Sequence, residues 1–233
     1  MQYFVADYPI ADLYTLSPEE SKHCIKVLRM NVNDHIYLTD GKGTLCTARI
    51  INANPKECLV EIIQRQPEYN KRNHYLHIAV AATKNTARIE WFIEKAVEIG
   101  IDEITLLTCD HSERNTQKTD RLQKIITSAM KQSLKTYRPL LNGPISMMDF
   151  LQQPFDGCKM VCYCDGDNRQ TMHQIYTAGQ PALVLIGPEG DFSQQEIETA
   201  LNKGYHPVTL GHSRLRTETA ALYATAAINF MNE

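Results

Sequence analysis

Two segments near the C-terminus combine glycines with charged residues in a pattern suited to ligand binding. The first reads Gly187-Pro188-Glu189-Gly190-Asp191-Phe192 and leads directly into Ser193-Gln194-Gln195-Glu196. A serine followed three residues later by glutamate is the pattern of a capping box, which opens a helix. Glycines in the preceding turn let a ligand approach main-chain amides closely. The segment therefore indicates either a ligand-binding turn or an ordinary strand-to-helix turn.

The second segment runs from Leu210-Gly211 to Ala220-Ala221 and also enters a helix. Its Thr217 and Glu218 suit a capped helix start. Arg214 and Arg216 do not, because cations near a helix N-terminus oppose the helix dipole. An anionic partner such as RNA phosphate would resolve this conflict.

The chain from residue 75 onward alternates strand and helix patterns that could position these segments. Apolar residues recur at helical spacing from Ile89 to Val97, which predicts a helix that ends at Gly100. The alternation predicts an α/β fold with a mostly parallel sheet covered on both faces. Ligands bind beyond the carboxyl ends of such strands, where both glycine segments fall. The expected strands are 75–82, 103–108, 160–164, 182–186 and 208–210, and the other expected helices are about 122–130 and 217–231.

Residues 1–70 have a different pattern of short β-like runs separated by turns, at 35–39, 44–51 and 58–64. One helix interrupts them, with Ser17 as N-cap and Pro18 at its first position, and it should run through His23 to about Val27. These features predict a small β-barrel. The polar stretch 66–73 separates it from the rest, which gives two predicted domains, 1–70 and 74–233.

The overall composition excludes several classes of protein. The 233 residues are 43% hydrophobic and 22% charged, which argues against disordered and fibrous chains. A formal net charge of −3 argues against a domain that holds nucleic acid mainly by bulk electrostatics. Any RNA target must therefore be recognised locally.

Cysteine use and hydropathy indicate the compartment. No apolar run approaches the roughly 20 residues that span a bilayer, and the start has no export signal, so we expect a cytoplasmic protein that uses no membrane. Seven cysteines without an export signal favour reduced thiols. Cys158, Cys162 and Cys164 could suggest zinc, but they fall in a strand-like run without paired ligand spacing, so we predict no metal.

Two familiar nucleotide sites are unsupported. No Gly-x-Gly-x-x-Gly follows the first strand of the α/β region, and no Gly-x-x-x-x-Gly-Lys-Ser/Thr is present. The glycine turns also lie late in the chain, whereas doubly wound cofactor folds carry the site in the first turn.

Taken together, the two C-terminal segments resemble the RsmE-type 16S ribosomal RNA uridine N3-methyltransferases of the SPOUT superfamily. The similarity rests on Gly187-Pro188-Glu189-Gly190 with Phe192 and Glu196, and on Leu210-Gly211 followed by Leu215-Arg216-Thr217-Glu218-Thr219-Ala220. Supporting similarity lies in His23 with Val27-Leu28-Arg29, in Lys84, in Glu90 through Gly100, and in Lys131-Gln132-Ser133. The sequence departs from the family pattern at Asp191, where a second glycine is common, at Ser213 and Arg214, and at Gln2-Tyr3.

The resemblance implies a fold that periodicity alone does not predict. It implies a PUA-like N-terminal barrel and a C-terminal SPOUT α/β-knot, in which the parallel sheet carries a trefoil knot, usually in a homodimer. The implied reaction is methyl transfer from S-adenosyl-L-methionine to N3 of one uridine in small-subunit ribosomal RNA, uracil 1498 in the standard rRNA numbering. The implied partner is that RNA, naked or in an assembled small ribosomal subunit.

The resemblance also implies roles for particular residues. Glu218 is the candidate base, with helix capping as its alternative, and Arg216 is the candidate for stabilising uracil charge, with a surface ion pair as its alternative. Candidate RNA contacts are Lys22, His23, Lys26, Arg29, Lys84 and Arg88, each of which could instead be a solvated charge or, for His23, a packed histidine. Donor binding is assigned to Leu185, Ile186, Gly187, Pro188, Glu189, Gly190, Leu210, Gly211, Leu215, Arg216, Thr217, Thr219 and Ala220.

Two other functions stay open at this point. The chain could be a non-catalytic ribosomal RNA-binding module of the same fold, although an intact Leu215-Arg216-Thr217-Glu218-Thr219 argues against it. It could also be a nucleotide-binding α/β enzyme of another class, which would bind ATP or NAD. Binding of S-adenosylmethionine would separate the methyltransferase from both, and binding of ATP or NAD would separate the other two from each other.

Overall fold

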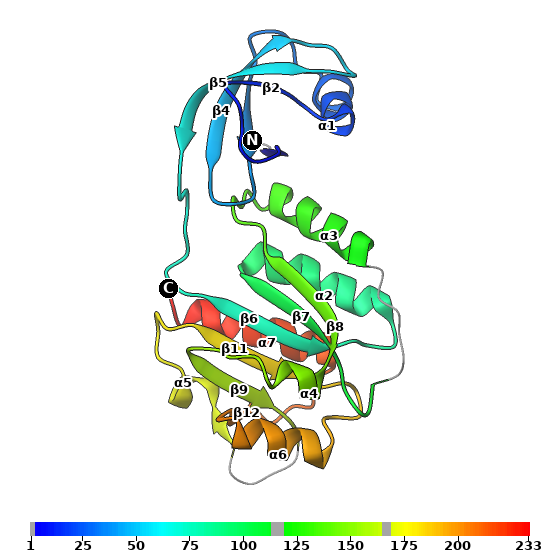
Figure 1. Cartoon of the computed structure of the whole chain (residues 1–233), viewed down its shortest axis with the longest axis vertical. Helices are drawn as coiled ribbons and strands as arrows, with labels where there is room; N and C mark the ends of the chain where they lie inside the picture. Colours follow the sequence, from blue (N-terminus) through cyan, green and yellow to red (C-terminus); the bar gives the residue numbers. More distant parts are fainter. Residues whose placement is uncertain (1–2, 113–118, 165–168) are drawn as a thin grey trace. The chain divides into compact units, whose positions relative to one another are not determined.

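The chain divides into two compact units in the computed structural model, which describes residues 3–112, 119–164 and 169–233 (Figure 1). The first unit comprises Met1–Lys71 together with Thr127–Arg138, and the second comprises Arg72–Ile126 with Pro139–Glu233. Helix α3 (Thr119–Gln132) therefore belongs partly to each. The sequence did not indicate that residues 127–138 group with the first unit. The domain limits 1–70 and 74–233 stay a prediction.

The first unit is a curled five-stranded sheet with one helical segment at its side (Figure 1). Its strand order is β1-β3-β4-β5-β2, with β1 parallel to β3 and the other pairs antiparallel. Alternate side chains of β3 and β4, such as Ile36, Leu38 and Ala48, form its buried core. The strands are β1 Tyr3–Val5, β2 Leu13–Thr15, β3 His35–Thr39, β4 Leu45–Asn52 and β5 Leu59–Gln66.

The helical segment of this unit starts as its sequence predicts. Ser17 caps α1 (Pro18–Lys22) by accepting a hydrogen bond from the amide of Glu20. The carboxylate of Glu20 does not return to the cap but accepts from Lys131 Nζ at 2.6 and 2.8 Å. The chain then continues as a wider π-helical turn, η1 (His23–Val27), so the predicted helix to about Val27 is confirmed.

Segment 127–138 is held in the first unit by main-chain hydrogen bonds as well as by this ion pair. The carbonyl of Thr136 accepts from Gly43 N at 2.9 Å and from Thr39 Oγ1 at 3.3 Å. Arg138 N donates to the carbonyl of Gly41 at 2.8 Å. These bonds join residues nearly 100 positions apart. Helical periodicity along the sequence therefore could not show that the segment belongs to the first unit.

The second unit is built on a seven-stranded, wholly parallel sheet. Its order is β10-β12-β9-β11-β6-β7-β8, with β11 near the centre between β9 and β6. All residues of β6 and β11 are buried, as expected for parallel strands covered on both faces. The strands are β6 Leu76–Ala81, β7 Glu103–Thr108, β8 Leu140–Ser146, β9 Cys158–Cys162, β10 Gln170–Thr171, β11 Ala182–Ile186 and β12 His206–Thr209.

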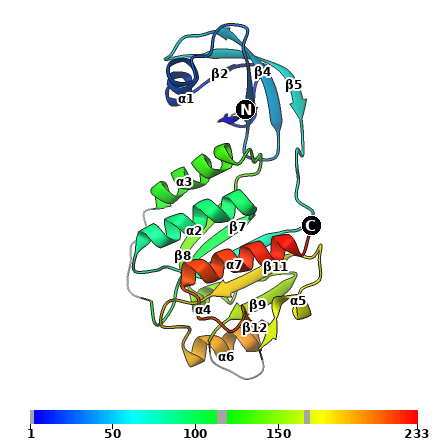
Figure 2. The ribbon, with the colours of Figure 1, turned by 180° about the vertical axis from the view of Figure 1, so that it is seen from behind.

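Helices cover both faces of this sheet. Helices α2 (Thr86–Ile99) and α7 (Thr217–Phe230) pack side by side on one face (Figure 2). Helices α4 (Met147–Phe150) and α6 (Gln194–Asn202) lie on the other, over a core that contains Met147 and Phe150. The short α5 (Met172–Ile175) follows β10.

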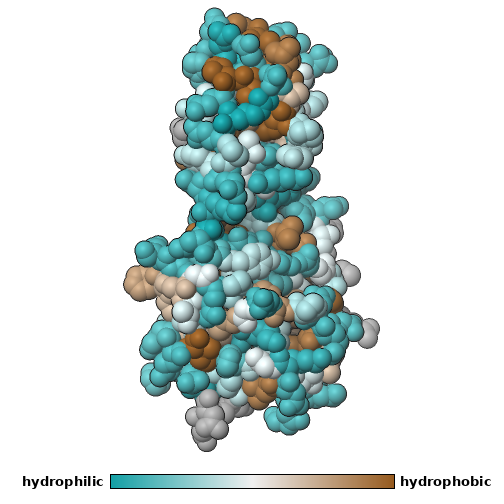
Figure 3. Space-filling view, turned by 60° about the vertical axis from the view of Figure 1, so that its left-hand side comes forward, coloured by the Kyte–Doolittle hydropathy of each residue, from teal (hydrophilic) through white to brown (hydrophobic). Residues whose placement is uncertain are grey.

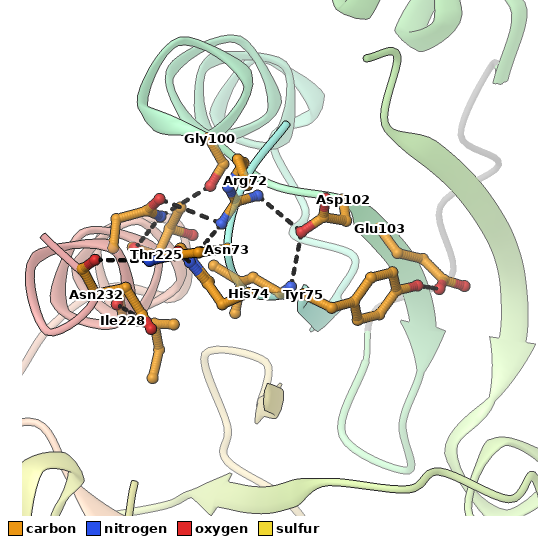
Figure 4. A network of polar contacts seen from close by, with 12 residues as sticks. Arg72, Asn73, His74, Tyr75, Gly100, Asp102, Glu103, Thr225, Ile228 and Asn232 are labelled. Atoms are coloured by element: carbon orange, nitrogen blue, oxygen red, sulfur yellow. Dashed lines mark hydrogen bonds and ion pairs between the residues drawn. The ribbon is translucent and has the colours of Figure 1, made fainter. Parts of the chain in front are cut away.

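A polar network ties the first residues of the second unit to its last helix (Figure 4). Arg72 Nη1 donates to Asp102 Oδ2 at 2.8 Å, and the same oxygen accepts from the amide of Leu76. Arg72 Nη2 donates to Asn229 Oδ1, while Asn229 Nδ2 donates to the carbonyl of Gly100. The amino end of β6, the end of α2 and the end of α7 are therefore held together.

The predicted α/β class with a parallel sheet and a small N-terminal β unit is confirmed, and β7 and β11 have the predicted bounds. Strand β8 was missed because it is an exposed edge strand that contains Gly143 and Pro144, which patterns assign to turns. The trefoil knot stays a prediction. No helix in the described ranges is long and apolar enough to cross a membrane, and those ranges contain no metal-binding cluster of His, Cys, Asp and Glu.

Candidate active site

The two glycine turns emerge at the same edge of the parallel sheet. One follows β11 and the other follows β12, and β9 lies between these strands. A buried hydrogen bond of 3.0 Å from Thr217 Oγ1 to the carbonyl of Gly187 joins the turns directly. The start of α7 is therefore fixed to the end of β11, and the two segments form one site.

The first turn is held in shape by Asp191. Its amide donates to the carbonyl of Pro188 at 3.0 Å, and its φ of +62° lies in the left-handed region. This conformation explains the glycine that the resemblance led us to expect here. Asp191 replaces it with a side chain that anchors the turn, since Oδ1 accepts from Phe192 N and Oδ2 accepts from Cys164 N at 2.6 Å.

The loop after β7 braces the same turn, and sequence analysis did not assign it. His111 Nδ1 lies 3.0 Å from the carbonyl oxygen of Gly190 and 3.1 Å from that of Asp191, so Nδ1 carries the proton and donates. Asp110 accepts from Ser193 Oγ at 2.6 Å, and its amide donates to Glu196. The available signal was position, because these residues follow a parallel strand at its carboxyl end.

The capping box that the sequence predicts at the start of α6 is present. Ser193 Oγ accepts from the amide of Glu196, and the carboxylate of Glu196 accepts from the amide of Ser193. Because Glu196 is buried and also bonds Asp110, the helix start is rigid. The turn from Gly187 to Asp191 is thus fixed at both ends.

Arg88, in the first turn of α2, lies between two carboxylates. Its Nη1 is 3.6 Å from Glu189 Oε1, and its Nε is 3.7 Å from Glu218 Oε1. These ion pairs offset the unfavourable position of a cation at a helix N-terminus. They connect the starts of α2 and α7 with the first glycine turn.

Glu218 is buried, with only 7% of its surface exposed. Its Oε1 faces Arg88, whereas Oε2 has no hydrogen-bond partner among the described residues. A buried carboxylate oxygen without a donor is costly, since each such group retains the penalty of desolvation. Glu218 Oε2 is therefore placed to accept a hydrogen bond from a bound molecule.

The second turn is more open than the first. Gly211 has a φ of +113°, and a Cβ built there would meet nothing within 4 Å. Arg214 and Arg216 are exposed, and neither forms an ion pair in the part of the chain that is described. Arg216 is the N-cap of α7 without a side-chain cap bond. The conflict between these cations and the helix dipole is thus left for an anionic ligand to resolve.

Two cysteines beside the turns are unsuited to nucleophilic chemistry. Burial raises the pKa of Cys162, at the end of β9, to about 12, and the negative charge of Asp191 acts in the same direction. Burial likewise raises the pKa of Cys109, after β7, to about 12. Both thiols are protonated at neutral pH, so the site carries no thiolate from these residues.

Comparison with known proteins decides the family. An RNA methyltransferase domain model matches residues 70–229, and an RNA methyltransferase PUA domain model matches residues 16–63. The chain belongs to the RNA methyltransferase family. The resemblance to RsmE-type enzymes inferred from the glycine segments is confirmed, and the protein is an enzyme.

Relatives and solved structures of this methyltransferase match along its whole length. A probable rRNA methyltransferase from Porphyromonas gingivalis is 40% identical, covers 100% of this chain and 98% of its own, and superposes with a TM-score of 0.94. The small-subunit rRNA methyltransferase E of Neisseria gonorrhoeae, solved bound to S-adenosyl methionine, is 26% identical with a TM-score of 0.88 and coverage of 100% and 98%. A ribosomal RNA small subunit methyltransferase E of Bacillus subtilis is 27% identical over 96% of this chain and 92% of its own.

The predicted donor-binding residues of the methyltransferase all lie on the two turns and the strands and helix that flank them. Leu185 to Pro188 and Thr217 are buried, whereas Glu189, Gly190, Gly211, Arg216 and Thr219 are exposed. Leu210, Leu215 and Ala220 are half-buried. The direct contact between the two sets is the bond from Thr217 to Gly187.

The predicted RNA contacts fall into two groups. Lys84 and Arg88 belong to the second unit, and Arg88 is engaged by Glu189 and Glu218. In the first unit, His23 is half-buried with its ring 6.2 Å from that of Phe4. Lys22, Lys26 and Arg29 of the first unit are exposed.

Proposed function

We propose that this enzyme transfers a methyl group from S-adenosyl-L-methionine to N3 of a single uridine in small-subunit ribosomal RNA, in the cytoplasm. The observation that carries the proposal is the buried, unpartnered Oε2 of Glu218 at the junction of the two turns. The Watson–Crick edge of uracil has one donor, the N3 imide, between two carbonyl acceptors. A buried carboxylate that lacks a donor is complementary to that group.

The residues at the turns fit the methyl donor. Gly190 and Gly211 are exposed, and the space beside Gly211 is free of neighbouring atoms. These turns and the flanking Leu185, Leu210 and Leu215 would hold S-adenosyl-L-methionine, as the solved relative from Neisseria gonorrhoeae is bound to it. The donor supplies an electrophilic methyl group on a sulfonium.

Glu218 and Arg216 divide the remaining work. Glu218 Oε2 accepts the imide hydrogen bond and takes the proton, because N3 must lose it before its lone pair can attack a methyl group. Arg88 holds Oε1 of the same carboxylate and so keeps Oε2 directed toward the uracil that receives the methyl group. Arg216, exposed and without an ion pair in the described residues, stabilises the developing uracil charge or a flanking phosphate.

The proposal is tested with purified small subunits, labelled donor and mass spectrometry of digested RNA. The wild-type enzyme should produce one 3-methyluridine per subunit. Glu218→Gln should lower turnover by roughly 100-fold or more, since the amide cannot take the proton, while donor affinity stays within a few-fold. Glu198→Gln, which alters an exposed carboxylate of α6, is the matched control and should be fully active.

A methylated product on another base atom, or full turnover of Glu218→Gln, would contradict the proposal. Calorimetry with S-adenosylmethionine separates the remaining alternatives. A non-catalytic RNA-binding module would give no heat, and a nucleotide-binding enzyme of another class would bind ATP or NAD instead.

We further propose that the enzyme is a homodimer. The small residues Ala221 and Ala224 of α7 are buried within the chain. The adjacent helices α2 and α7 nevertheless expose large apolar side chains, Trp91 at 44%, Tyr223 at 51% and Phe230 at 77%. Light scattering at micromolar concentration should give about twice 26.5 kDa. A mass of one chain would refute the dimer.

A further inference from the structure

Asp191 holds a backbone conformation that glycine adopts freely and that costs most other residues energy. Its φ of +62° lies in the left-handed region. Aspartate tolerates this region better than most residues, because its short side chain can bond the local backbone. The carboxylate at this position therefore supplies something that a glycine in the same turn could not.

The two oxygens of the Asp191 carboxylate bond different parts of the fold. Oδ1 accepts a hydrogen bond from the amide of Phe192 at 2.8 Å, within the turn itself. Oδ2 accepts from the amide of Cys164 at 2.6 Å, two residues beyond β9. Because β9 pairs directly with β11, this bond fastens the turn after β11 to the end of the neighbouring strand.

His111, three residues beyond β7, holds the same turn from a second loop. Its Nδ1 lies 3.0 Å from the carbonyl oxygen of Gly190 and 3.1 Å from that of Asp191. Two consecutive carbonyl groups thus point at one donor, and without that proton their oxygens would repel each other. The ring of His111 therefore stabilises the backbone conformation that Asp191 requires.

These bonds act on the turn and not directly on a ligand. The bonded partners of Asp191 and His111 are main-chain groups, and the amide of Asp191 also donates to the carbonyl of Pro188. Glu189 and Gly190, between these restraints, are exposed. A turn that is already in its binding conformation loses little conformational entropy when a ligand binds, so the restraints favour binding.

We propose that Asp191 and His111 form one clamp that sets the affinity for S-adenosyl-L-methionine by fixing the first glycine turn in its binding conformation. Both are positioning residues. The proposal rests on the proposed function, in which the donor binds at the glycine turns, and deepens it by naming residues that control this site from outside the predicted donor-binding set. Because the turn needs both restraints, loss of either frees it, and loss of both adds little.

Asp191→Gly is the first test, because glycine fits the φ of +62° and only the carboxylate is lost. The KM and Kd for S-adenosylmethionine should rise about tenfold, while kcat at saturating donor stays within about twofold. Asp191→Asn should lose less, since the amide oxygen keeps one of the two bonds. Asp40→Gly removes a carboxylate that accepts from the amides of Lys42 and Thr44 in the first unit, and this matched control should keep native donor affinity.

His111 is tested by loss and rescue of its proton donor. His111→Leu should raise the KM for the donor about tenfold, again with little change in kcat. His111→Asn should restore most of the affinity, because asparagine Nδ2 is as far from Cβ as histidine Nδ1 and can donate to the same carbonyls. A side chain that only filled space would not be rescued in this way. His173→Leu, at an exposed histidine of α5, is the matched control.

The double variant Asp191→Gly with His111→Leu shows whether the clamp is one unit. Its donor affinity should lie within about twofold of the weaker single variant. A combined loss of about 100-fold, the product of the two single losses, would overturn the proposal, because independent contacts with the donor multiply in this way. Native donor KM in both single variants would overturn it as well.

Gly190→Val separates failure of the clamp from failure of the proposed site. If this variant loses donor affinity while Asp191→Gly and His111→Leu keep it, the donor binds at the turn and only the clamp is wrong. If Gly190→Val also binds the donor normally, the donor binds elsewhere, and both the proposed site and the clamp are wrong.

Discussion

The paired glycine turns and the turn at residues 22–32, which contains η1 and which we call the η1 turn, use polar groups in opposite ways. At the glycine turns, Thr217 and Glu218 are buried, and Thr217, Asp191 and His111 all bond main-chain atoms. At the η1 turn, both the cations and several apolar side chains are exposed to solvent. Figure 3 shows brown apolar patches among teal polar surface on the first unit. Fixed, buried dipoles suit charge that develops during a reaction, whereas solvated cations suit a polyanion that releases counterions on binding. Changes at the first region should therefore be large and insensitive to salt, and changes at the second small and dependent on salt.

The largest effect is expected at Gly190. A Cβ there would lie 3.1 Å from the Cβ of His111, so valine forces the turn or the β7 loop to move. Gly190→Val should lower affinity for S-adenosylmethionine by roughly 100-fold, about 2.7 kcal/mol, at low and high salt alike. Calorimetry measures it. Gly190→Ala should lose less, and native affinity of the valine variant with native Tm would show that the donor does not bind at this turn.

Buried polar groups of the second unit should also make its stability depend on pH. Burial lowers the pKa of His77 to about 4, and the nearby Glu103 only partly opposes this shift. The unfolded chain takes up a proton near pH 6.5 and the folded chain does not, so stability is complete above about pH 6.5 and falls as the pH falls toward 4. At pH 5 the loss from this group is about 2 kcal/mol.

Urea denaturation at pH 7 and pH 5 checks this effect. His77→Gln, which can keep a hydrogen bond to Thr105, should lose less stability between the two pH values than the wild type. His206→Gln changes an exposed histidine and should match the wild type. Equal pH dependence in the His77 variant would mean that this histidine does not stay neutral in the folded enzyme.

Arg216 combines features of the two regions, because it is exposed like the cations of the η1 turn but lies in the second unit beside the glycine turns. Arg216→Lys should lower single-turnover methyl transfer by about tenfold, roughly 1.4 kcal/mol, with little change in donor affinity, since lysine lacks the planar fork of donors. If saturating subunits restore the rate, Arg216 binds RNA, which is the role predicted for Lys22, Lys26 and Arg29. Full activity at both saturating and limiting subunits would leave it a surface charge.

The smallest effect is expected at Lys26. Lys26→Gln should weaken RNA binding by about two- to threefold near physiological salt and reduce the salt slope by about 1. Donor affinity should not change. A large loss of RNA affinity that does not depend on salt would mean that Lys26 behaves like the buried residues of the glycine turns. The contrast between the two regions would then be wrong.

Local patterns were sufficient for the elements and for the turns. Alternation and helical period placed β7, β11 and the start of α7, because each depends on residues adjacent in the chain. Capping chemistry placed the starts of α1 and α6 for the same reason. Strand β8 was lost where Gly143 and Pro144 made an exposed edge look like a turn. His111 was lost because nothing local distinguishes a histidine that bonds a turn 79 residues away.

By itself, the amino-acid sequence determined the α/β class, the two glycine turns and, through its resemblance, the family. The tertiary structure alone decided that Thr217 bonds Gly187, that Arg88 lies between Glu189 and Glu218, and that 127–138 joins the first unit. The reason is that strand order, β12-β9-β11-β6, is set by packing of distant segments and not by neighbours in the chain. The left-handed strain at Arg29 likewise became visible only once the backbone of η1 was known.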